Sequence, residues 1–254
     1  IFRNAARAWC QGMTGARLVS TGLGGLPGRY LQKFTRASAA FALVSDAAMA
    51  SLGGTLKRRE KISERLADVL AWLYLGSAAV KKFVDDGRPA ADRPFLRWAC
   101  DHALFNIQEA FRGLIDNFPN RLLAWKLCAI IFPLGARQRP PSDALGAELA
   151  RALLENREER LRLSADIFVP PSGELGLGLL EKALAKIVPA MAVERKIKDA
   201  IKAGTLAKVG GDALADKAVE TGVITAEERT CLREGEAARE EAIQVDAFPP
   251  RRPA

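Results

Sequence analysis

The chain has 254 residues, of which 49% are hydrophobic and 27% charged, as in globular proteins with a sizeable core. A net charge of +8 suits either an anionic partner or only a soluble basic surface. Lys and Arg alternate with Glu and Asp along the chain, which argues against a nucleic-acid-binding protein.

The cysteines and the single histidine argue against a metal site of the usual zinc kinds. The four cysteines are far apart in the sequence, at Cys10, Cys100, Cys128 and Cys231. No C-x-x-C pair occurs, and His102 is the one histidine. We therefore expect a reduced, cytoplasmic protein with buried thiols and no bound metal.

The start of the chain and its uncharged runs bear on targeting. The first residue is Ile and the opening lacks the apolar core of a signal peptide, so we expect a piece of a longer protein. The longest uncharged run, Val69 to Val80, is shorter than the roughly 20 residues that span a bilayer. We expect a chain that does not cross a membrane, with a peripheral position at the inner membrane as an alternative.

Residues 1–29 are predicted to be an N-terminal connector. Residues 1–20 are weakly helical, and Thr21–Arg29 is rich in glycine. A phosphate-binding loop is disfavoured because no Gly-Lys-Ser/Thr follows and no β-branched strand precedes it. A flexible connector is the preferred interpretation.

Two long helices follow, each with apolar or small residues at alternating spacings of three and four. The first, Tyr30 to Leu52, ends at Gly53 and Gly54, and its predicted face is Leu31, Phe34, Ser38, Phe41, Ser45, Ala48 and Leu52. The second, Leu52 to Phe83, organises the chain, and its predicted seam is Ile62, Leu66, Val69, Leu73, Gly76, Val80 and Phe83. Leu70 and Ala79 are expected to widen this seam.

A further helix is predicted from a cap at Asp92 to about Phe118. Its main face is Leu96, Cys100, Ala103, Ile107, Ala110 and Leu114, with a second stripe of Phe95, Trp98, His102 and Phe105. Apolar residues on two sides predict burial between neighbouring helices. His102 lacks partners for a catalytic triad, so a hydrogen-bonded core histidine is favoured over a catalytic base.

The remainder is predicted to contain shorter helices. Arg121–Phe132 is strongly apolar, and the basic, proline-rich loop 135–143 precedes a helix capped by Ser142 or Asp143. Helical pieces are then expected near 176–188, 190–203, 211–220 and 225–242, with Pro189 breaking the first pair and a capping box from Thr225 to Glu228.

These patterns predict an all-α fold, since no segment shows convincing strand alternation. The predicted architecture is an antiparallel helical bundle over 30–134 followed by a looser region of short helices over 135–243. The connector, residues 1–29, precedes the bundle, and a disordered tail, 244–254, ends the chain.

Several strings then resemble one family. Leu43–Gly54 and Leu56–Leu70 closely resemble the C-terminal region of the large bacterial acyl-CoA dehydrogenases of fatty-acid β-oxidation. The further matching strings, in register over about residues 30–250, are Leu73–Leu75 with Ser77-Ala78, Asp86–Arg88, Asp116–Arg121, Ile131–Pro133 with Gly135, Pro141–Asp143, Gly178–Leu184 and Val245–Phe248. The long central helix also resembles, faintly, the extra C-terminal bundle of very-long-chain acyl-CoA dehydrogenases.

The resemblance implies an enzyme that oxidises acyl-CoA to trans-2-enoyl-CoA, with a glutamate as the base and FAD as the hydride acceptor. In the family the base lies in a Val-Glu-Gly-Ala-Asn-type stretch, and it and the flavin-binding segments lie upstream of this region. Glu234-Gly235 lacks the family's neighbours, and Glu174 matches nothing catalytic. We therefore expect no catalytic, flavin-binding or metal-binding residue here, and no activity from this chain alone.

Two roles are open for such a chain. It can pack on the catalytic core of an acyl-CoA dehydrogenase, or on a second subunit in a homodimer. Alternatively, it can be a non-catalytic module that binds an anionic membrane surface or a partner, as the C-terminal region of one family relative does. The predicted surface for the second role is Lys57, Arg58, Arg59, Lys61, Trp125, Arg137 and Arg139, for which a merely solvated face is the plain alternative.

Overall fold

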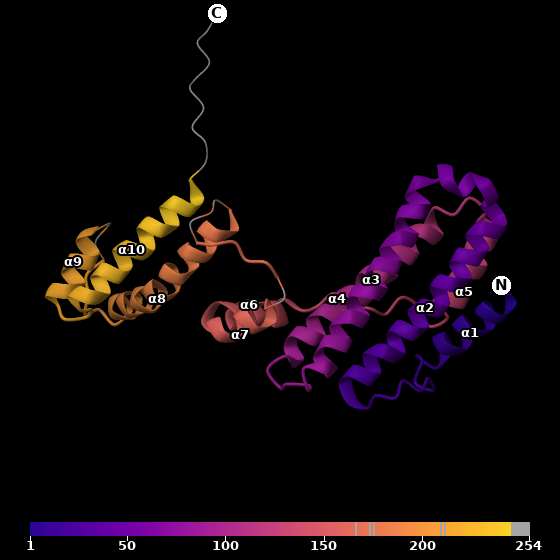
Figure 1. The fold of residues 1–254 in the computed structure, drawn as a ribbon, viewed down its shortest axis with the longest axis horizontal. Coiled ribbons are helices and arrows are strands. Elements are labelled where there is room, and N and C mark those ends of the chain that lie inside the picture. The colour runs from indigo at the N-terminus through magenta and orange to yellow at the C-terminus, as the bar shows by residue number, and fades with distance from the viewer. Residues whose placement is uncertain (166, 173, 175, 209, 211, 245–254) are drawn as a thin grey trace, which may run out of the picture. The chain divides into compact units, whose positions relative to one another are not determined.

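A computed structural model describes residues 1–244 except 166, 173, 175, 209 and 211 (Figure 1). The described residues form helices and contain no strand, which confirms the all-α prediction. The chain divides into two compact units, residues 1–150 and 151–254. Of the predicted disordered tail, 244–254, all but Gln244 lies outside the described residues.

The first unit holds the longer helices. Its elements are α1 (Phe2–Met13), α2 (Gly25–Leu52), the 3-10 turn η1 (Gly53–Arg58), α3 (Glu60–Asp85), α4 (Arg93–Asp116), α5 (Arg121–Ile131) and most of α6 (Asp143–Glu155). The second unit contains α7 (Arg157–Leu163), α8 (Leu177–Lys202), α9 (Asp212–Glu220) and α10 (Ala226–Ile243).

Helix α3 packs chiefly on α4 and also on α2, through the seam that its sequence predicts. Six of the seven predicted seam positions are buried: Ile62, Val69, Leu73, Gly76, Val80 and Phe83. The helix begins at Glu60 rather than Leu52, because Gly53 adopts φ +50° and ends α2 before the η1 turn. The expectation that Leu70 widens the buried seam is wrong: its side chain is 55% exposed, since only one narrow face of α3 has neighbours.

The buried face of α2 differs from the predicted one. Of the predicted face, Phe34 and Ala48 are buried, four residues are half-buried and Ser38 is exposed. The further residues that face the core are Tyr30, Ala37, Ala39, Ala40, Leu43, Val44 and Ala47. Because alanines occupy several sides of this helix, spacing alone did not single out the correct face. Helix α2 approaches α3 closely at Phe34, whose ring would lie 2.2 Å from a Cβ added to Gly76.

The predicted flexible connector is partly helical, because α2 begins at Gly25. Gly28 is buried in its first turn, and a Cβ there would lie 1.9 Å from the carbonyl oxygen of Leu23. The preceding chain therefore folds back onto the helix backbone, and a glycine is required at that contact.

Helix α4 buries five of its six predicted main-face residues, with Ala110 half-buried. The prediction that the second stripe is buried is wrong: Trp98 is exposed, and Phe95, His102 and Phe105 are half-buried. The second buried side is formed instead by Leu104, Phe111 and Ile115, which lie beside the main face on the side of α4 that faces the bundle.

Several predicted helix starts are confirmed by hydrogen bonds. Ser142 Oγ accepts the amide of Leu145 at 3.3 Å, and Thr225 and Glu228 form the complete capping box. Asp92 occupies the N-cap position of α4 and is buried, although its side chain makes no cap hydrogen bond. The hydrogen-bonded caps at Ser142 and Thr225 fix where α6 and α10 begin without tertiary contacts.

In the second unit, the predicted break at Pro189 is wrong, since α8 runs unbroken through it. Proline within a helix costs about 3 kcal/mol because it removes one backbone hydrogen bond and clashes with the preceding turn. Helix α8 packs along α10 on both sides of Pro189, and a Cβ on Gly235 would lie 2.6 Å from Cβ of Ala190. This packing offsets the local penalty.

One stretch, Gly25–Arg58, is long and apolar enough to span a membrane by length and composition alone. The buried side chains of α2 within it belong to the core of the first unit, together with α3 and α4. A core helix passes the same test as a spanning one, so this stretch is weak evidence for a membrane segment.

Replacing Leu73 by Ala should lower the free energy of unfolding of the first unit by about 2–5 kcal/mol, because the side chain is buried in the seam. Leu70→Ala is the matched control and should change it by less than about 0.5 kcal/mol. All four tryptophans lie within residues 1–150, so urea unfolding followed by tryptophan fluorescence reports this unit. Equal losses in the two variants would contradict the observed seam.

Candidate functional site

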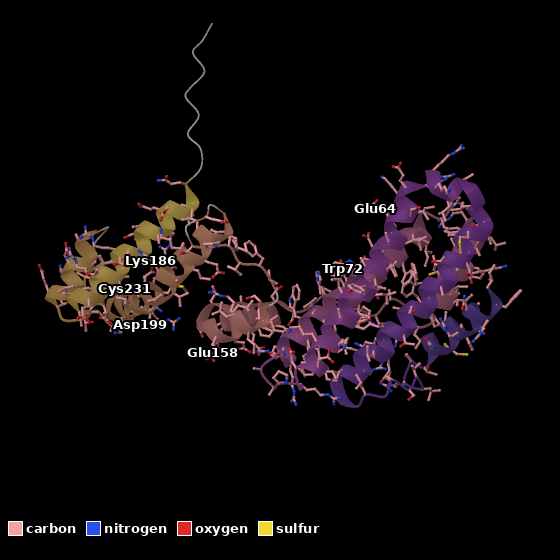
Figure 2. The ribbon with its side chains drawn as sticks, viewed as in Figure 1. Glu64, Trp72, Glu158, Lys186, Asp199 and Cys231 are labelled. Carbon is pink, nitrogen blue, oxygen red and sulfur yellow. The ribbon has the colours of Figure 1, made fainter. Side chains whose placement is uncertain are left out.

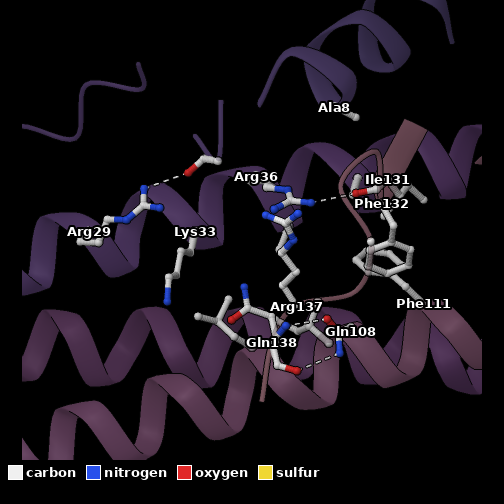
Figure 3. Close-up of a pocket in the computed structure, with 16 residues that line it drawn as sticks. Ala8, Arg29, Lys33, Arg36, Gln108, Phe111, Ile131, Phe132, Arg137 and Gln138 are labelled. Carbon is white, nitrogen blue, oxygen red and sulfur yellow. Dashed lines mark hydrogen bonds between the residues drawn. The ribbon is translucent and has the colours of Figure 1, made fainter. Parts of the chain in front are cut away.

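A cavity of about 100 Å³ lies in the first unit, lined by α1, α2, α4 and the loop after α5 (Figure 3). Its floor is apolar and consists of Ala37 and Ala40 from α2 and Leu104, Ile107 and Phe111 from α4. Four cationic side chains also line it: Arg29, Lys33, Arg36 and Arg137. Among the described lining residues none is acidic, so the cavity combines an apolar floor with a cluster of positive charges.

Two of the arginines are oriented by neutral acceptors. Arg29 Nη1 donates to the carbonyl oxygen of Gly15 at 2.8 Å and to Oε1 of Gln32 at 2.9 Å. Arg36 Nη2 donates to the carbonyl oxygen of Ile131 at 2.9 Å. These bonds hold the guanidinium groups in place without neutralising their charge.

Gln108 fixes the loop that brings Arg137 to the cavity. The Gln108 side chain is 6% exposed; its Nε2 donates to the carbonyl oxygen of Gln138 at 3.1 Å, and its Oε1 accepts the Gln138 amide at 2.8 Å. A buried amide satisfied on both sides ties this loop to α4. Figure 3 shows the Arg137 guanidinium beside that of Arg36.

The crowding of cations affects their protonation. Burial lowers the pKa of Arg36, and the charges of Arg137 and Arg29 lower it further. Burial likewise lowers the pKa of Lys33, which the charge of Asp101 partly opposes. Both directions mean that the folded protein disfavours these positive charges, as expected for like charges gathered in a partly buried place.

A tyrosine and an aspartate border the cavity beside Lys33. Tyr30 Oη donates to Oδ1 of Asp101 at 3.1 Å, and Lys33 Nζ lies 5.2 Å from the centroid of the Tyr30 ring. Burial, followed by the charge of Asp101, raises the pKa of Tyr30, so its hydroxyl stays a hydrogen-bond donor. Asp101 thus accepts a hydrogen bond from Tyr30 and keeps its negative charge, which acts on Lys33.

The surface predicted from the sequence is divided among different elements. Lys57, Arg58, Arg59 and Lys61 are all exposed, on η1 and the start of α3. Trp125 is 72% exposed on α5, which packs on α1 and α4, whereas η1 packs on α2 and α3. Arg139 is exposed and lines a neighbouring hollow with Arg137, which also lines the cavity.

Three of the four cavity cations were not predicted as site residues. Arg29, Lys33 and Arg36 lie on α2 and recur at intervals of three or four residues, which places them on one side of a helix. This spacing was the available signal in the sequence. It could not show that Arg137, about a hundred residues later, meets them.

Residues 1–248 match a family model described as acyl-CoA dehydrogenase, C-terminal, bacterial type. The chain belongs to this family. The match confirms the resemblance inferred from the strings within Leu43–Leu70 and beyond. No solved structure matches the chain.

In this acyl-CoA dehydrogenase C-terminal domain, the Glu234-Gly235 pair lies on α10, with the Glu234 side chain exposed. Glu234 forms an ion pair at 3.5 Å with Lys186, which Figure 2 labels on α8. Gly235 is buried where α10 approaches α8 most closely. Both residues thus have a structural role in holding the two helices together.

His102 lies in an aromatic cluster rather than in the core. Its ring stacks on Trp98, with centroids 4.8 Å apart, and contacts Trp72 edge-on at 5.1 Å. Figure 2 labels Trp72 on α3. The imidazole thus joins α3 to α4 through ring contacts, and the predicted hydrogen-bonded core position is wrong.

The expectation of buried thiols holds only for Cys100. Its Sγ lies 3.9 Å from the carbonyl oxygen of Gly76, and burial raises the pKa of the thiol to about 12. Cys231 is half-buried, whereas Cys10 and Cys128 are exposed. Short apolar helices such as α1 and α5 bury only one side, which leaves these two thiols in solvent.

A thiol reagent at pH 8 should therefore label Cys10 and Cys128 quickly, Cys231 more slowly, and Cys100 only after unfolding, because the thiolate is the reacting form. Mass spectrometry of peptides from native and urea-unfolded protein measures the order. The Cys10→Ser/Cys128→Ser variant is the control and should lose the fast phase. Fast labelling of Cys100 in that variant would contradict the packing of α3 on α4.

Proposed function

We propose that this chain is the accessory C-terminal part of an FAD-dependent acyl-CoA dehydrogenase, which converts acyl-CoA to trans-2-enoyl-CoA in fatty-acid β-oxidation. The family match supports the parent enzyme. The reaction needs a carboxylate that removes a proton and a flavin that accepts a hydride. The cavity in the first unit offers cations instead of a carboxylate, so the proposed role is packing rather than chemistry.

An apolar stripe on the outer face of α3 carries this proposal. The exposed residues of the stripe are Ala67, Leu70, Ala71, Tyr74, Leu75 and Ala78. They belong largely to the uncharged run Val69–Val80, so α3 is apolar both toward its own bundle and away from it. A central helix with an uncharged outer face is typical of a surface that another domain covers.

We assign the catalytic core of the same dehydrogenase as the partner of this stripe. A C-terminal domain and its core are encoded together, and the interface between them needs only a patch of apolar side chains such as Leu70 and Tyr74. A second copy of the chain is the competing partner. In that case, dilution would weaken the contact, since only association between molecules depends on concentration.

In the dehydrogenase that contains this chain, Leu70→Glu/Tyr74→Glu should destabilise the contact with the catalytic core by at least about 2 kcal/mol, because an interface would bury unpaired carboxylates. The expected result is faster proteolysis between core and C-terminal domain and a lower melting temperature of the flavin-loaded enzyme. The matched control, Met49→Glu/Leu122→Glu, alters two exposed apolar residues outside the stripe. If both variants match the parent enzyme, the stripe does not contact the core.

A second candidate function is peripheral binding of the chain, from the cytoplasm, to an anionic inner membrane. It is favoured by the exposure of Lys57, Arg58, Arg59 and Lys61 together at the α2–α3 connection. Basic residues at a membrane surface each contribute about 1 kcal/mol of attraction to anionic lipid.

Vesicles of phosphatidylglycerol should then co-sediment with the parent chain at low salt and less well at high salt, because salt screens the attraction. The Arg58→Gln/Arg59→Gln/Lys61→Gln variant should bind at least tenfold more weakly. Lys81→Gln/Lys82→Gln/Lys126→Gln removes three other exposed charges and is the control. Identical, salt-independent partitioning of all three proteins would exclude this role.

A further inference from the structure

The cavity between α1, α2 and α4 gathers four positive charges, which the charge of Asp101 offsets only in part, at Lys33. Arg29, Lys33 and Arg36 come from α2, and Arg137 comes from the loop after α5 (Figure 3). Two carboxylates lie close by, and each accepts a hydrogen bond from a side chain outside the four cations. Asp101 accepts a hydrogen bond from the Tyr30 hydroxyl, and Glu109 accepts one from Arg112 Nη1 at 3.4 Å.

The protein uses specific contacts to keep these cations together. Carbonyl oxygens of Gly15 and Ile131 orient Arg29 and Arg36, and the buried Gln108 holds the loop that carries Arg137. Gathering like charges in a partly buried place costs free energy unless an anion is bound. An arrangement of four cations that is held by hydrogen bonds, with Asp101 offsetting only part of the charge, indicates a site for an anionic ligand.

The geometry favours phosphate among the anions. Guanidinium groups match the oxygens of phosphate in planar, paired hydrogen bonds, and several cations from different directions suit a doubly charged group. The cavity of about 100 Å³ accommodates a phosphate group, and its apolar floor suits the carbon attached to it. An adjoining hollow lined by Arg17 continues the positive surface on one side, and a second hollow holds Arg97 and Arg139 together with Asp101.

We propose that this cavity is a binding site for a phosphate-bearing anion, held by Arg29, Lys33, Arg36 and Arg137 above the apolar floor. The phosphate can come from a soluble phosphate monoester or from a phospholipid headgroup. The site does not depend on the contact between α3 and the catalytic core, so either proposal can fail without the other.

Titration calorimetry of the full chain with inorganic phosphate, and then with glycerol 3-phosphate, tests the site. The Lys33→Gln/Arg137→Gln variant should bind both probes at least tenfold more weakly than the parent. The η1 variant, Arg58→Gln/Arg59→Gln, removes the same charge at the exposed end of η1 and should leave both affinities within about twofold of the parent, since a specific site depends on position rather than net charge.

Thermal melting shows whether the cavity variant, Lys33→Gln/Arg137→Gln, loses binding because the cations are gone or because it is unfolded. Removing Lys33 and Arg137 relieves repulsion, so the variant should melt no lower than the parent in phosphate-free buffer. Phosphate should raise the melting temperature of the parent and of the η1 variant, because a ligand that binds only the folded state stabilises it, but not that of the cavity variant.

Vesicles distinguish the two sources of phosphate. If the headgroup is the ligand, phosphatidylglycerol vesicles will bind the parent, lose binding in the cavity variant and be displaced by glycerol 3-phosphate. If a soluble monoester is the ligand, the cavity variant will lose the soluble probes and leave vesicle binding unchanged. The proposal is overturned if neither soluble probe binds the parent, or if the cavity and η1 variants lose affinity equally.

Discussion

The burial of one narrow face of α3 is the contact on which the first unit depends. Gly76 lies at its centre: the ring of Phe34 from α2 occupies the place of a side chain there, and Cys100 of α4 lies against the carbonyl oxygen of the same glycine. Three helices thus meet where one residue has no side chain. Interiors are packed densely, so this meeting point determines how far apart α2 and α4 lie along the rest of the bundle.

The cavity is a consequence of that spacing. Once α3 holds α2 and α4, the basic side of α2 and the apolar residues of α4 face each other, and α1 and the loop after α5 close the remaining sides. Gln108 then positions the loop through two hydrogen bonds to Gln138. The same packing that buries the core therefore creates a small volume in which cations meet apolar side chains. The residues of the outer stripe of α3 are exposed and do not line this volume.

In the second unit, tertiary packing overrides local sequence preference. Pro189 predicts a break in α8, yet close packing of Ala190 on Gly235 and ion pairs on both sides, Lys186–Glu234 and Lys196–Glu228, keep the helix continuous. The free energy of these contacts is spread over the length of α8, whereas the cost of proline is confined to one turn. This unit has its own core, in which Val193 and Ile197 of α8 cluster with Leu206, Ala218 and Ile224.

The sequence by itself determined the all-α class, the family, most helix boundaries with caps, and the seam of α3, because these depend on spacing and on residues near one another in the chain. Most of the buried face of α2 was decided by the tertiary structure, since its alanines allow several faces to pack, although the spacing did predict Phe34 and Ala48. The exposure of Leu70 and the unbroken α8 were decided in the same way. The meeting of Arg36 with Arg137 also required the fold, because no local pattern records which distant segments the packing of α2 against α4 brings together.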